Sequence, residues 1–126
     1  MPQSILVVDD NDQNRVLLHD VLLMSGFYVL LAGNGEEAVR LARDLHPDLI
    51  LMDIQMPVMN GLEAGKLLRS DPRTKDIRIL ALSCAGSIDD KDNFFATGFD
   101  GYIDKPIDIR GLPNIIKKHL QDGEHG

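Results

Sequence analysis

Leu49-Ile-Leu-Met-Asp53 is the stretch that decides the fold, because it is a short apolar run that ends in an acid. With Asp48 in front of it, this run predicts a strand over 48–53 that is covered on both faces of a sheet. Three other short apolar runs lead in the same way to a polar or charged side chain. They are Ile5-Leu-Val-Val before Asp9-Asp10, Ile79-Leu-Ala-Leu before Ser83, and Tyr102-Ile103 ahead of Lys105.

Helical patterns separate these runs. Asn11 or Asp12 can cap a first helix, and Asn34 followed by Glu37 has the spacing of a capping box. The expected elements are strands over 5–8, 27–31, 48–53, 78–83 and 101–103, and helices over about 12–25, 35–46, 61–70, 87–97 and 112–120. This alternation predicts an α/β fold in which helices cover both faces of a parallel sheet.

Apolar residues at helical spacing predict which helix faces are buried. The expected core positions are Leu17, Leu18, Val21, Leu22 and Met24 in the first helix, Ala38, Leu41, Ala42 and Leu45 in the second, and Leu112, Ile115, Ile116 and Leu120 in the last. The helix over 87–97 has weaker support, because Gly86-Ser-Ile-Asp-Asp-Lys-Asp is a poor helix start by propensity.

Length and composition indicate one domain over residues 1–126, with a core over about 4–121 and a polar tail over 122–126. The net charge of −7 and the absence of a Lys/Arg cluster argue against nucleic acid or an anionic membrane as partners. Cys84 is the only cysteine, and no signal peptide or membrane-length apolar run is present. We therefore expect a soluble protein of the reducing cytoplasm.

The polar residues that follow the strands predict the functional site. The carboxyl ends of parallel strands lie at one edge of a sheet, where ligands of open α/β folds bind. Asp9, Asp10, Asp53, Ser83 and Lys105 should therefore gather in one crevice. Each pair of carboxylates about 4 Å apart costs on the order of 4 kcal/mol at an effective dielectric constant near 20. A bound divalent cation is the expected remedy.

These motifs together resemble the receiver domain of two-component response regulators. The matching residues are Val8-Asp9-Asp10-Asn11, Leu51-Met52-Asp53-Ile54-Gln55-Met56-Pro57, Gly61, Leu82-Ser83 and Tyr102-Ile103-Asp104-Lys105-Pro106, and the resemblance covers about residues 4–121. It implies a flavodoxin-like, doubly wound sheet of five parallel strands in the order 2-1-3-4-5 with five helices. It also implies a stand-alone, single-domain response regulator.

The resemblance implies a role for each acid. Asp53 is the expected phosphoacceptor, which takes a phosphoryl group from a phosphohistidine as an acyl phosphate. Asp10 and Asp53 would bind Mg²⁺ directly, Asp9 mostly through water, and the backbone carbonyl of Gln55 would complete the protein ligands. Taken alone, an aspartate at the end of a strand is more often a turn or helix-cap residue.

The resemblance also assigns the other side of the crevice. Ser83 and Lys105 would bind the phosphoryl oxygens, and a cis peptide bond between Lys105 and Pro106 would direct the lysine inward. Tyr102 resembles the aromatic side chain that switches position when the residue equivalent to Ser83 moves. Cys84 stands where the family more often has alanine, and we interpret it as a small buried residue.

The implied function is a phosphorylation-controlled switch that is not a turnover enzyme. Its partners would be a histidine kinase or a histidine phosphotransfer protein, and a downstream protein that binds the face of the fourth helix, fifth strand and fifth helix. A monomer and a phosphorylation-dependent dimer are both compatible with the sequence.

Two alternatives remain open at this point. The first is a Mg²⁺-dependent phosphatase that works through an aspartyl phosphate, but haloacid-dehalogenase-type enzymes have a second aspartate where this chain has Gln55. The second is a receiver-like interaction module that is never phosphorylated, although such a module would normally have lost one of the acids or the lysine.

Overall fold

The computed structural model describes residues 3–54, 61–84, 98–105 and 107–125. Five parallel strands form one sheet in the order β2-β1-β3-β4-β5. The strands are β1 (Ser4–Val8), β2 (Tyr28–Ala32), β3 (Leu49–Asp53), β4 (Arg78–Cys84) and β5 (Gly101–Lys105). The described helices are α1 (Asp12–Met24), α2 (Gly35–Leu45), α3 (Gly61–Ser70) and α5 (Leu112–His125). The predicted flavodoxin-like fold and its strand order are confirmed, while the helix expected over 87–97 lies outside the described residues.

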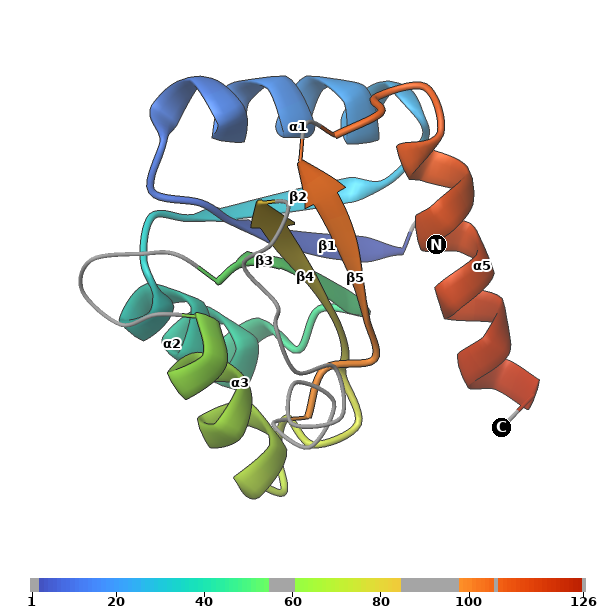
Figure 1. The fold of residues 1–126 in the computed structure, drawn as a ribbon. Helices are drawn as coiled ribbons and strands as arrows, with labels where there is room; N and C mark the ends of the chain where they lie inside the picture. The colour runs from blue at the N-terminus through green and yellow to red at the C-terminus, as the bar shows by residue number, and fades with distance from the viewer. Residues whose placement is uncertain (1–2, 55–60, 85–97, 106, 126) are drawn as a thin grey trace.

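The helices form two layers around the sheet, with α1 and α5 on one face and α2 and α3 on the other (Figure 1). The central strand β3 serves both layers, because successive side chains of a strand point to opposite faces. Ile50 and Met52 pack with the buried residues of α2 and α3. Leu49 and Leu51 pack with those of α1 and α5. All four side chains are fully buried, which confirms a strand covered on both faces.

Side-chain caps begin the first two helices as the sequence predicts. The Asn11 side-chain oxygen accepts the Asn14 N–H (3.0 Å), and that of Asn34 accepts the Glu37 N–H (2.9 Å). Each cap satisfies a backbone donor of the first helical turn that has no partner within the helix. The starts of α1 and α2 are thereby fixed immediately after the ends of β1 and β2.

The buried helix faces are narrower than predicted. In α1, Leu18 and Leu22 are buried, whereas Leu17 is exposed and Met24 is 89% exposed. Leu45 of α2 is also exposed, and so is Ile115 of α5. A helix packed on a sheet buries one stripe, so apolar residues beside that stripe reach the surface. No helix in the described part of the chain is long and apolar enough to cross a membrane.

Two elements at the carboxyl-terminal end of the chain are longer than the sequence predicts. β5 continues to Lys105, because it pairs with β4 as far as Cys84. α5 continues to His125, beyond the expected helix end near Leu120. The longer β5 is important for the site, since it carries the backbone of Lys105 to the same edge of the sheet where β3 and β4 end.

Candidate functional site

Three aspartates meet where β1 and β3 end. Asp9 and Asp10 follow β1, and Asp53 is the last residue of β3. Val8 pairs with Met52 in the sheet, so Asp9 and Asp53 come one step later on neighbouring strands. One carboxylate oxygen from each aspartate lies within 4.8 Å of the other two. The predicted convergence of these three acids is therefore observed in the structure.

The three acids differ in their exposure to solvent. Asp9 is 1% exposed and Asp53 is 4% exposed, whereas Asp10 is exposed. Asp9 and Asp53 are, with Thr74, the buried polar residues of the described part of the chain. A buried carboxylate is stable only when hydrogen bonds or a cation compensate for its lost hydration. Within the cluster, Asp10 therefore faces solvent, whereas Asp9 and Asp53 are buried.

Asp9 is held by the first turns of α1 and by β2. Its carboxylate accepts the Asn11 N–H (2.9 Å) and the Asn14 side-chain amide (3.4 Å). Its own N–H donates to the Ala32 carbonyl at the end of β2 (3.1 Å). The sequence analysis did not identify Asn14 in this role, although its position five residues after Asp9 places it in the first turn of the capped helix.

The donor set fits a hard divalent cation. Mg²⁺ prefers oxygen ligands in an octahedron at about 2.0–2.1 Å, so two opposite ligands are about 4.2 Å apart. Neighbouring ligands in such an octahedron are about 3 Å apart. The carboxylate oxygens of the cluster, which lie within 4.8 Å of one another, would move closer together around such an ion. At these separations each pair of charges repels by roughly 3 to 4 kcal/mol at an effective dielectric constant of 20, and a cation would remove this cost.

The backbones of Ser83 and Lys105 lie at the same edge of the sheet. Asp53 pairs with Leu82, so Ser83 is one residue further along β4. Cys84 pairs with Lys105, the last residue of β5. The predicted residues thus come from adjacent strands, in the order β1, β3, β4, β5. The side chains of Ser83 and Lys105, and the whole of Gln55 and Pro106, lie outside the described residues, so their roles stay predictions.

Tyr102 lies in the middle of the edge strand β5, where it pairs with Ala81. Its side chain is partly buried and packs against the core between the sheet and helices α2 and α3. This environment is compatible with a half-buried packing role. It is also compatible with the predicted switch role, which would require the side chain to change position between two states of the protein.

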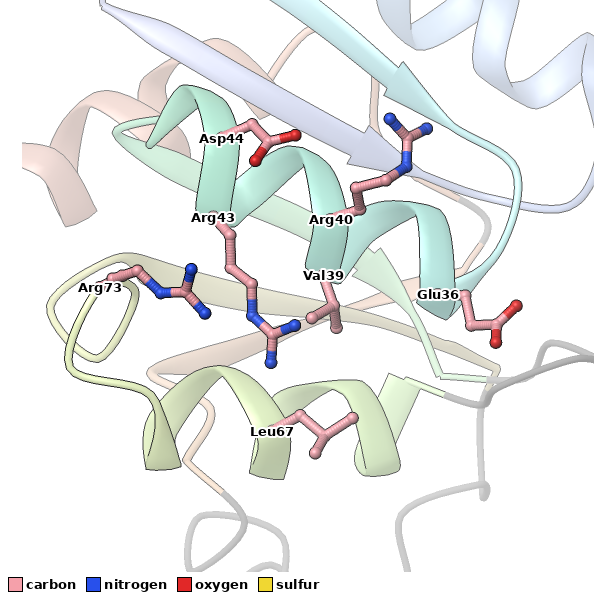
Figure 2. A pocket seen from close by; sticks show the side chains of 7 residues that line it. All are labelled: Glu36, Val39, Arg40, Arg43, Asp44, Leu67 and Arg73. Carbon is pink, nitrogen blue, oxygen red and sulfur yellow. The ribbon is translucent and has the colours of Figure 1, made fainter.

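A groove lies between α2 and α3, as Figure 2 shows. This groove has a volume of about 450 Å³ and is lined by Glu36, Val39, Arg40, Arg43, Asp44, Leu67 and Arg73. Arg73 (2.9 Å) and Arg43 (2.8 Å) both donate to the Asp71 carboxylate. Hydrogen bonds from the Arg73 side chain and N–H, aided by Arg43, hold the pKa of Asp71 well below its ordinary value. None of the predicted site residues lines this groove.

Comparison with known proteins agrees with this geometry. Residues 5–117 match the family model of the response regulator receiver domain. The polar-differentiation response regulator DivK of Brucella anthropi is 38% identical over 122 residues, which cover 97% of this chain and 99% of that protein. The chain belongs to the response regulator receiver domain family. As a receiver domain it is a component of two-component signalling.

Solved receiver-domain structures share the whole fold. The chemotaxis protein CheY4 of Vibrio cholerae has a TM-score of 0.87 and 30% identity, and the match covers 94% of this chain and 98% of that one. The receiver domain of a sensor histidine kinase from Pseudomonas aeruginosa also has a TM-score of 0.87 and 30% identity, over 96% of this chain and 99% of that one. The latter structure contains a magnesium ion coordinated in its active site cleft.

Proposed function

We propose that this receiver domain is a phosphorylation-controlled switch that accepts a phosphoryl group from a phosphohistidine on Asp53 in the presence of Mg²⁺. The observation that carries this proposal is the meeting of Asp9, Asp10 and Asp53 within 4.8 Å, with Asp53 at the end of the central strand. A strand covered on both faces fixes the position of its last residue. The backbone of Asp53 is therefore held in place at the proposed cation site.

The transfer exchanges one bond to phosphorus for another. An oxygen of the Asp53 carboxylate attacks the phosphorus atom, the P–N bond of the phosphohistidine breaks, and the imidazole leaves with the electron pair and takes up a proton. The signal ends by hydrolysis, in which water attacks the phosphorus and the P–O bond to Asp53 breaks. The products are inorganic phosphate, a proton and the original carboxylate, so the domain dephosphorylates itself. We propose that this reaction resets a switch and that the domain is not a turnover enzyme.

Asp9, Asp10, Asp53 and the backbone carbonyl of Gln55 would hold Mg²⁺. When bound, the ion supplies positive charge that offsets the charge of the carboxylates and of the incoming phosphoryl group. The fit rests on the chemistry of the donor set, because hard oxygen ligands at this spacing suit Mg²⁺. The magnesium ion coordinated in the related receiver domain of the Pseudomonas aeruginosa sensor histidine kinase supports the same assignment.

Ser83 and Lys105 complete the proposed phosphoryl site. A hydroxyl and an ammonium group would bind the phosphoryl oxygens, because phosphoryl transfer depends mainly on positioning and charge stabilisation. Strand register supports this assignment, since Ser83 follows the residue that pairs with Asp53. We also propose the cis peptide bond between Lys105 and Pro106 that would aim the lysine at this edge.

The signal would pass from the phosphoryl group to the face that includes β5 and α5. Phosphorylation adds roughly −1.5 to −2 charges and new hydrogen-bond acceptors, which can shift a two-state element. Tyr102 is the proposed switch residue, since its partly buried side chain lies on β5 next to the strand that carries Ser83. The phosphodonor would be a histidine kinase or a histidine phosphotransfer protein, and the target a protein that binds the face of the fourth helix, β5 and α5.

Incubation with Mg²⁺ and a small acyl phosphate tests the proposal. We expect intact-mass spectrometry to show addition of one phosphoryl group, and the Asp53→Asn variant to show none. Asp44→Asn is the matched control, because Asp44 is an exposed acid of α2 outside the cluster. Labelling of Asp53→Asn at the wild-type level, or absence of labelling in the wild type, contradicts the assignment.

A further inference from the structure

Arg15 of α1 makes a contact with the acid cluster that the proposed function does not use. Its guanidinium Nη1 donates to the backbone carbonyl of Asp9 at 2.6 Å. A second nitrogen, Nη2, pairs with the carboxylate of Asp12 on the same helix. The side chain is only 21% exposed, although it is charged. Arg15 therefore joins the start of α1 to the end of β1.

Gly33 borders the same guanidinium from the loop after β2. A Cβ atom on Gly33 would lie 3.3 Å from Arg15 Nη1 and 3.8 Å from Cζ. Contacts of 3.0–3.4 Å are tighter than nine in ten real Cβ contacts, so the guanidinium would have to shift by a few tenths of an ångström. Gly33 is not among the residues of positive φ, so a side chain at this position meets the guanidinium and not a strained backbone.

The contacts of Arg15 and Asn14 act on different parts of Asp9. Asn14 donates to the carboxylate of Asp9, and Arg15 donates to its carbonyl oxygen. The N–H of Asp9 donates to Ala32 of β2. The backbone and the carboxylate of Asp9 are thus held by hydrogen bonds from α1 and β2. The guanidinium of Arg15 contacts the Asp9 carbonyl and the Asp12 carboxylate, and these contacts do not involve a carboxylate of the cluster.

We infer that Arg15 is a positioning residue for the cation site: together with Asn14, and in the space left by Gly33, it holds Asp9 so that the acid cluster is pre-organised for Mg²⁺. This inference rests on the proposed function, because it takes the cation to be Mg²⁺. Residues that orient metal ligands typically change metal affinity by about 10- to 100-fold when they are replaced. A guanidinium can serve two acceptors in fixed directions, whereas an ammonium group on a flexible stem cannot replace it.

A positioning role and a simple charge effect of Arg15 predict different Mg²⁺ affinities for its variants. If the guanidinium acts only as a positive charge, its removal in Arg15→Gln reduces repulsion of the cation and tightens Mg²⁺ binding, while Arg15→Lys leaves the affinity unchanged. If Arg15 positions Asp9, both variants lose the two-acceptor contact and both bind Mg²⁺ more weakly. The comparison of the two variants therefore separates the two effects.

The experiment is calorimetric titration of Mg²⁺ into the metal-free full chain and its variants, with urea unfolding of each metal-free protein as a check on folding. We expect the dissociation constant to rise about tenfold for Arg15→Gln and severalfold for Arg15→Lys. Arg40→Gln is the matched control, since Arg40 is an exposed arginine of α2, and we expect it to leave the dissociation constant unchanged.

Gly33→Ala provides a second, smaller perturbation. We expect this variant to weaken Mg²⁺ binding about two- to threefold in the wild-type background and not at all when Arg15 is already glutamine, because the added methyl group acts through the guanidinium. An equal loss in both backgrounds contradicts that route.

Failure of the inference is distinguishable from failure of the proposed function. Unchanged or tighter Mg²⁺ binding by a folded Arg15→Gln variant, with normal binding by the wild type, overturns the positioning role alone. A change in unfolding free energy without a change in Mg²⁺ affinity shows a merely structural role and overturns it as well. Absence of Mg²⁺ binding by the wild type at millimolar concentration overturns both.

Discussion

At the scale of single residues, the three aspartates of the cluster differ in their exposure to solvent. The sequence predicts that Asp9, Asp10 and Asp53 meet, because each follows a run that forms a parallel strand. It does not predict that Asp9 and Asp53 are buried while Asp10 faces solvent. It also gives little sign of Arg15 at the Asp9 carbonyl, because the position of an arginine in a helix does not reveal which acceptor its long side chain reaches.

His46, at the end of α2, has a strained backbone conformation that a substitution can relieve. Its φ is 46°, in the left-handed region where a Cβ atom is unfavourable. We expect His46→Gly to raise the free energy of unfolding by about 0.5 to 1 kcal/mol, because glycine adopts this conformation without strain. Urea unfolding measures the difference.

The control for His46→Gly is the same change one residue earlier. Leu45 is the last residue of α2 and is exposed, so Leu45→Gly removes helix propensity without relieving strain and should lower the free energy of unfolding. A loss of stability in His46→Gly similar to that in Leu45→Gly would show that the left-handed conformation carries no cost.

At the scale of elements, periodicity predicts where helices and strands lie better than which side chains they bury. All nine described elements lie within a few residues of their predicted positions. The helix faces are less accurate, because apolar residues such as Leu17 and Met24 fit the helical period and yet lie beside the stripe that meets the sheet. The ends of β5 and α5 depend on tertiary pairing and packing, which a local pattern does not contain.

The ion pairs of Asp71 connect α2 to the loop between α3 and β4, and they predict a pH dependence. Arg73 and Arg43 lower the pKa of Asp71 in the folded protein. The unfolded chain therefore binds a proton at a higher pH than the folded chain, and stability rises with pH in the interval between the two pKa values. The contribution of Asp71 is complete above the ordinary carboxyl pKa of about 4 and decreases as the pH falls below it.

Asp71→Asn should therefore unfold more easily than the wild type at pH 7, and the difference should shrink at pH 3. Urea unfolding of both proteins at the two pH values measures this. Asp76→Asn is a suitable control, because Asp76 is an exposed acid of the loop between α3 and β4. A difference between Asp71→Asn and wild type that is the same at both pH values contradicts the role of the Asp71 charge.

At the scale of the whole molecule, the strand order brings the site together. Alternating strands and helices predict a parallel sheet, but they do not say which strands are neighbours, and the order 2-1-3-4-5 followed only from the resemblance to receiver domains. In this order β1 lies beside β3, so Asp9 and Asp53 are adjacent. β4 and β5 then place the backbones of Ser83 and Lys105 further along the same edge.

The most direct test of the switch is a pair of amide NMR spectra of the Mg²⁺-loaded chain, recorded before and after addition of a small acyl phosphate. We predict that signals from the ends of β3 and β4 and from β5, including Tyr102, move in the wild type and stay in place in Asp53→Asn. Spectra that do not change in the wild type, or that change equally in Asp53→Asn, contradict the proposal that phosphorylation of Asp53 switches this protein.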